Sequence, residues 1–316
     1  MTGRKQIKEN KLSIKDYWAI LKETFVGFDN DRVMKLSAAL AYYTIFSIGP
    51  MLIVLIGVAG LFFGQDAIQG EVSSQLSNFV GQDAALQIEE VLKKTTLQHD
   101  NVIATIIGVV TLLIGATGIF GEMQDSINFI WGLKTKAKKG LIKLVLNRVT
   151  SFSMIVVLGF VLMVSLMLNA VLGIFLGKLN SIFPDRLVDY VFVVDYILMF
   201  VVITALFSFI FKVLPDAKIL WKHVRTGAMV TAVLFMGGKF LIGYYLQNNT
   251  TITAYGAAGS LIVLLLWVYY SAIILYFGAE FTKSHAMKRG VYIAPNRYAE
   301  WIIEPDHLKK HNTNEV

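Results

Sequence analysis

The 316-residue chain is 55% hydrophobic and only 16% charged, and its formal net charge is +7. Soluble domains carry about a quarter of charged residues, so this composition, with a mean hydropathy of +0.60, excludes an ordinary soluble protein. The chain contains no cysteine, which excludes disulfides, thiolate metal sites and a catalytic thiol.

Residues 1–35 predict a cytoplasmic segment with an amphipathic helix. Between residues 12 and 34 apolar side chains recur near one helical face, with lysines around them. This pattern is typical of a helix that lies in the membrane interface. The first long apolar run begins only after this charged stretch, so we do not expect a cleavable signal peptide. The apolar positions are Leu12, Ile14, Trp18, Leu21, Phe25 and Phe28.

Six apolar segments follow, each as long as the ~20 residues that a spanning helix needs. Lipid tolerates only structures that satisfy their backbone hydrogen bonds internally. We therefore expect an all-α, polytopic membrane protein with six transmembrane helices in a domain over 36–283, an outer loop at 65–100 and a cytoplasmic tail at 284–316. The predicted spans are about 36–64, 102–131, 149–177, 188–211, 226–246 and 255–281.

The charges between these segments predict the orientation. Residues 1–35, 132–148, 212–225 and 282–316 together hold 24 of the 29 basic residues. Basic residues concentrate on the cytoplasmic side of membrane proteins, so both termini are expected in the cytoplasm, with the domain in the plasma (inner) membrane. Because topology accounts for the net charge, we expect membrane lipids as partners and no nucleic acid.

The first span contains Gly49 and Pro50 near its middle. Proline removes a helical hydrogen bond and kinks or breaks a helix. Broken helices occur at transporter binding sites, so this pair is a candidate helix break. A plain packing kink is the alternative.

Polar side chains inside the predicted spans are the candidate site. Glu122 and Asp125 share a face at the end of the second span, and Glu280 ends the sixth, which places both ends in the cytoplasmic leaflet. Lys239 lies well inside the fifth span, and Asn169 lies in the third. An isolated charge inside a membrane costs at least about 2.5 kcal/mol. These five residues could line a transport cavity.

The alternative for Glu122 and Glu280 is a structural ion pair. Lys239, Arg148 and Lys283 are the bases that could supply it. Snorkelling of the carboxylates to the interface is a third explanation.

Four segments in order make the chain similar to a known family. They are LSAALAYYTIFSIGPML (36–52), ATGIFGEMQDSINFIWG (116–132), LPDAKILWKHVRTGA (214–228) and AYGAAGSLIVLLLWVYYSAIILYFGAEFT (254–282). They resemble the YihY/BrkB family over about residues 30–290. The resemblance implies a six-span bacterial inner-membrane protein, in a family that once carried a ribonuclease BN label.

The residues themselves do not favour an enzyme. A metal-dependent nuclease needs clustered histidine and carboxylate ligands that activate water. The five histidines are scattered, and His307 with its neighbour Asp306 belongs to the tail. We expect no catalytic residues, no metal and no cofactor.

The function predicted is an inner-membrane transporter or exporter of a small polar or lipid-linked, anionic substrate, with the intramembrane charges lining its cavity. A non-transporting scaffold for envelope proteins is the alternative. A membrane ribonuclease is the least favoured of the three. The oligomeric state stays open.

Overall fold

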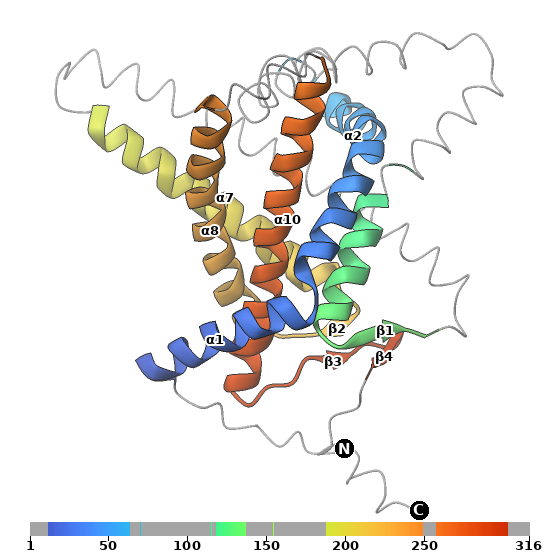
Figure 1. Ribbon diagram of the computed structural model, residues 1–316, viewed down its shortest axis with the longest axis vertical. Helices are drawn as coiled ribbons and strands as arrows, with labels where there is room; N and C mark the ends of the chain where they lie inside the picture. Colours follow the sequence, from blue (N-terminus) through green and yellow to red (C-terminus); the bar gives the residue numbers. More distant parts are fainter. Residues whose placement is uncertain are drawn as a thin grey trace, which may run out of the picture.

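The computed structural model describes residues 12–63, 118–136, 188–248 and 257–302, together with the isolated residues 70, 115 and 154. These ranges are mainly helical. Figure 1 shows α10 as the central helix, with α2 on one side and α8 on the other. α10 packs against α1, α2 and α8, while α7 packs against α8. The helices are α1 (Ile14–Asn30), α2 (Val33–Phe63), an unlabelled helix over 118–130, α7 (Val188–Val213), α8 (Trp221–Asn248) and α10 (Ala257–Lys288).

Three helices in the described part of the chain are long and apolar enough to cross a membrane. They contain the segments Tyr196–Val213, Trp221–Ile242 and Leu261–Lys288. α2 adds a shorter apolar stretch, Val33–Ile48. Apart from isolated positions, the predicted span 149–177, the outer loop 65–100 and the first part of the predicted span 102–131 lie outside the described residues.

Two helices extend beyond the spans predicted for them. α8 begins at Trp221, five residues before the predicted start, and α10 ends at Lys288, seven residues after the predicted end. The boundary drawn between a membrane domain and a tail at residue 284 therefore falls inside α10. The helix continues because its last turns remain packed, as the fully buried Ala286 shows.

The helix break predicted at Gly49 and Pro50 does not interrupt α2, which runs as one helix from Val33 to Phe63. A proline inside a helix costs one hydrogen bond and strains the preceding turn. The chain nevertheless keeps its helical conformation through this position.

Two short antiparallel ladders, absent from the sequence-based prediction, lie at one end of the bundle. β1 (Leu133–Thr135) pairs with β4 (Ala299–Trp301), and β2 (Ala217–Lys218) pairs with β3 (Ala294–Pro295). Figure 1 shows them near the end of α10, on the side where α1 also lies. We call this end of the molecule the strand end. The segment after α10 thus fastens the loops that follow the 118–130 helix and α7.

A buried carboxylate reinforces this arrangement. Asp216, in the loop after α7, accepts hydrogen bonds from the side-chain amides of Asn128 at 3.1 Å and Asn296 at 3.2 Å. The Asp216 backbone N–H also donates to Asn128 Oδ1 at 2.8 Å. One side chain therefore joins the 118–130 helix, the α7–α8 loop and the C-terminal segment.

α8 and α10 approach each other through two reciprocal glycine–threonine contacts. A Cβ atom built on Gly227 would overlap Oγ1 of Thr282, and one built on Gly278 would overlap Oγ1 of Thr231. Each threonine hydroxyl donates to a carbonyl one turn earlier in its own helix, Thr231 to Gly227 at 2.8 Å and Thr282 to Gly278 at 2.7 Å. Small residues at such positions let helix backbones pack closely in membranes.

Candidate functional site

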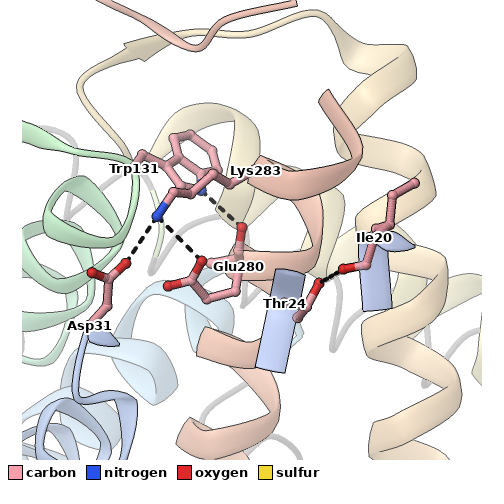
Figure 2. Close-up of polar contacts among 7 residues, drawn as sticks. Ile20, Thr24, Asp31, Trp131, Glu280 and Lys283 are labelled. Carbon is pink, nitrogen blue, oxygen red and sulfur yellow. Dashed lines mark hydrogen bonds and ion pairs between the residues drawn. The ribbon is translucent and has the colours of Figure 1, made fainter. Parts of the chain in front are cut away.

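α10 carries Glu280 into a buried position near its strand end. The side chain of Glu280 is 1% exposed, and the Nζ atom of Lys283 lies 3.4 Å from its Oε2 atom. The same ammonium donates to Oδ2 of Asp31 at 3.0 Å. Figure 2 shows Lys283 between the two carboxylates. We call Glu280, Lys283 and Asp31 the acid–base cluster.

Local structure positions each member of the cluster. Glu280 and Lys283 are three residues apart on α10, so they share a helical face. Asp31 is the C-cap of α1, and its backbone N–H bonds the carbonyl of Gly27 at 2.8 Å. A Cβ atom on Gly27 would lie only 2.6 Å from Oε2 of Glu280. The absence of a side chain at Gly27 therefore lets the α1 backbone cover the carboxylate.

The cluster has one base for two acids. Besides Lys283, the described residues offer no hydrogen-bond donor to either carboxylate oxygen of Glu280. The carboxyl groups of Asp31 and Glu280 lie close to each other, because both contact the same ammonium group. If both carboxylates are ionised, the cluster holds a net charge of about −1, and Glu280 is its fully buried member, since Lys283 and Asp31 keep 28% and 23% of their side chains exposed. A proton or cation would lower the cost of burying the Glu280 charge.

The backbone beside Glu280 is held from a second direction. Trp131, directly after the 118–130 helix, donates its indole N–H to the carbonyl of Ala279 at 3.1 Å. Figure 2 shows this bond beside the cluster. Within α1, the buried hydroxyl of Thr24 is satisfied by the carbonyl of Ile20 at 2.7 Å. Glu280 is thus enclosed by α1 on one side and anchored through Trp131 on the other.

Glu122 and Asp125 form a second acidic group next to α10. Both lie on the 118–130 helix, where the hydroxyl of Ser126 approaches Oε1 of Glu122 at 3.5 Å. The phenol of Tyr276, which is fully buried in α10, lies close to these side chains. Tyr276 precedes Glu280 by one helical turn. The two acidic groups therefore neighbour consecutive turns of the same helix.

Lys239 lies at a different height of the bundle from the acid–base cluster. Gly238, its neighbour on α8, packs against the side chain of Tyr270 on α10. Tyr270 precedes Glu280 by ten residues, which is about 15 Å along a helix. The structure thus separates Lys239 from the acid–base cluster, and Lys283 is the base that contacts Glu280. Asn169 lies outside the described residues.

Two buried histidines were missed as a pair by reasoning from the sequence. His223, near the start of α8, and His285, near the end of α10, have ring centroids 6.2 Å apart. His285 also stacks on Phe281. No local pattern connects residues so far apart in the chain. Among the described residues, no group of three histidine, aspartate or glutamate side chains is placed to hold a metal ion.

Comparison with known proteins identifies the family of this chain. The family model described as virulence factor BrkB matches residues 24–299. This chain belongs to the virulence factor BrkB family. The match extends beyond the region of resemblance expected from the motifs. It includes the last part of α1, the acid–base cluster and β3 of this BrkB-family protein, and it ends at the first residue of β4.

Several relatives of about 27–29% identity are named membrane proteins. A UPF0761 membrane protein of Vibrio vulnificus (strain YJ016) is 27% identical over 280 residues, which is 84% of this chain and 82% of the relative. One from Stenotrophomonas maltophilia (strain R551-3) is 29% identical over 267 residues, covering 83% of this chain and 59% of the longer relative. One from Aeromonas salmonicida (strain A449) is 27% identical over 263 residues, covering 81% and 84%. No solved structure matches. The chain is therefore a membrane protein of the BrkB and UPF0761 group.

Proposed function

We propose that this BrkB-family protein is an inner-membrane transporter or exporter of a polar or lipid-linked, anionic substrate. In this proposal the acid–base cluster binds the coupling ion. The observation that carries it is Glu280, a carboxylate with 1% exposure on a helix apolar enough to span a membrane. Among the described residues, it shares its base, Lys283, with Asp31.

Energetics support a functional role for this carboxylate. A charged side chain inside a membrane costs at least about 2.5 kcal/mol, and such residues commonly mark ion and proton pathways. Lys283 compensates one negative charge, and Asp31 leaves a second one in the cluster. A proton or a monovalent cation would neutralise the remainder. Its binding and release would then change the attraction between α1 and α10.

The substrate class rests on the basic groups. A lysine inside a spanning helix suits the phosphate or carboxylate of an anionic substrate, and Lys239 holds that position on α8. The strand end carries exposed bases such as Lys134 and Lys218, so the positive-inside rule favours the cytoplasm for this end. Under that orientation the acid–base cluster lies toward the cytoplasmic leaflet.

A scaffold for envelope proteins is the second candidate, and the cluster itself favours it in one respect. Lys283 bonds α1 to α10, so the same three charges could serve only to fix the N-terminal helix. Removing one partner of such a pair would lower stability without changing any specific activity.

Reconstitution separates the two candidates. Purified protein in liposomes is presented with a panel of anionic solutes and lipid-linked sugar phosphates, and transport currents are recorded on a supported membrane. We expect at least one member to give a current that Lys239→Ala weakens. Glu300→Gln is the matched control, because Glu300 forms an exposed pair with Lys134 in the short ladder. Absence of current across the panel, together with an unchanged cellular phenotype of Lys239→Ala, would refute the transport proposal.

A further inference from the structure

α1 presents three distinct faces. One packs on α10 and includes the buried Ile20 and Thr24. A second is polar and exposed and includes Lys22 and Glu23. The third is an apolar stripe that no part of the described chain covers, because Ile14 is 91% exposed and Trp18 is 72% exposed.

The stripe follows one line along the helix. Ile14, Trp18, Leu21 and Phe25 are spaced by four, three and four residues, which places them on a single helical face. Phe25 is 59% exposed, although one edge of its ring touches α10. A continuous exposed apolar stripe of this length on a helix marks a site of contact with a membrane or a protein.

Contacts with α10 place the two ends of α1 along the apolar span. Phe25 and Phe28 of α1 pack on Phe277, at centroid distances of 5.2 and 6.1 Å. Asp16 instead pairs with Lys288, the last residue of α10, at 3.8 Å. Phe277 lies three turns nearer the middle of the apolar span than Lys288. The second half of α1, which carries Phe25, therefore lies nearer the middle of the apolar span than its first turn, which carries Asp16.

We propose that this stripe, Ile14, Trp18 and Phe25 with Leu21, is a membrane-docking surface that inserts among the lipids of the leaflet at the strand end. The bilayer is the occupant that the structure favours, because α1 packs on a bundle that contains three helices long and apolar enough to span a membrane, and lipid would surround such a bundle. The exposed Lys15 and Lys22 flank the stripe on its polar side. This arrangement of an apolar face with bordering lysines matches interfacial helices that bind anionic lipid surfaces.

Membrane docking of the stripe does not depend on transport activity. The chain is well suited to a test of the docking. Because the sequence has no cysteine, Trp18→Cys introduces a unique site for an environment-sensitive fluorophore. Glu23→Cys, on the polar face of the same helix, is the matched aqueous control. Leu241→Cys, at a 70% exposed position on the apolar helix α8, is the lipid-facing control. All three positions are exposed, so folding should tolerate the substitutions.

The labelled variants are reconstituted in phosphatidylcholine–phosphatidylglycerol vesicles, and quenching by acyl-chain nitroxides is compared with quenching by iodide. We expect the probe at position 18 to behave like that at 241, quenched by the nitroxides and protected from iodide, with the reverse result at 23. Iodide quenching at position 18 equal to that at 23 would place the stripe in water and overturn the proposal. Protection of position 18 from both quenchers would mean that a second copy of the chain covers it, which would also overturn the proposal.

Discussion

The contact between α8 and α10 makes a strong prediction for the Gly278→Ala variant. In an exposed helix this substitution stabilises by roughly 0.5–1 kcal/mol, because alanine is the better helix former. At Gly278 the added methyl group would overlap Oγ1 of Thr231 and lie 2.9 Å from its Cβ and 3.0 Å from its Cγ2. Thr231 is fully buried, so it cannot move aside into solvent.

The magnitude follows from three contributions. Overpacking of a filled site costs about 1–3 kcal/mol. Displacing the Thr231 hydroxyl from the carbonyl of Gly227 costs roughly 0.6–1 kcal/mol more. After the gain in helix propensity, Gly278→Ala should be less stable than the wild type by about 1–3 kcal/mol. Gly237→Ala is the control on α8, where an added Cβ atom meets nothing within 4 Å, and it should be neutral or slightly stabilising.

Unfolding in mixed micelles with a rising fraction of denaturing detergent, followed by tryptophan fluorescence, measures both variants. A double-mutant cycle with Thr231→Ala should give a coupling energy above about 0.5 kcal/mol, since the two residues are in contact. Equal stability of Gly278→Ala and Gly237→Ala, or zero coupling, would refute the close packing described for these helices.

Three further predictions concern the strand end. Arg32 has a φ angle of 52°, so Arg32→Gly should raise the free energy of unfolding by about 1 kcal/mol, measured in the same micelles. Asp216→Asn replaces a carboxylate oxygen that accepts from Asn128, and it should lower stability by about 1.5–3 kcal/mol in that assay. The N–H and hydroxyl of Ser13, followed by the weaker effect of Lys288, hold the pKa of Asp16 below its usual value of 3.8. A carboxyl group whose pKa is lower in the folded than in the unfolded chain stabilises the fold at pH values above its unfolded pKa. Protection of the backbone amides at the start of α1 should therefore persist down to about pH 4 and fall at lower pH. In Asp16→Asn this pH dependence should disappear.

Helices could be predicted from the sequence where a long apolar run marks them. The predicted span 188–211 agrees closely with α7, Val188–Val213. The predicted sixth span ends at residue 281, because hydropathy falls at Lys283 and Lys288, whereas α10 continues to Lys288. Tertiary contact explains the continuation, since Lys283 pairs with Asp31 and Lys288 with Asp16 of α1. Local hydropathy cannot register a partner so distant in the chain.

The candidate site was foreseen in the same partial way. Glu280 drew attention as a charge within an apolar helix, and Lys283 was among its three suggested partners. Asp31 was not, because 252 residues separate it from Lys283. Gly27 gave no signal either, since its role exists only where the α1 backbone crosses the carboxylate of Glu280. Both residues become part of the site because α1 packs against α10. A contact between residues so far apart in the chain leaves no pattern in the sequence around either of them.

The role of Glu280 in ion coupling is tested most directly by Glu280→Gln. The amide keeps the shape of the side chain and removes its charge, while Lys283 keeps Asp31 as its partner. Substrate-driven proton movement is measured in liposomes with an internal pH dye, for the wild type and the variant at equal reconstitution. We predict that Glu280→Gln is inserted and folded like the wild type and loses the proton movement. A variant that moves protons with its substrate at the wild-type rate would contradict the proposed role.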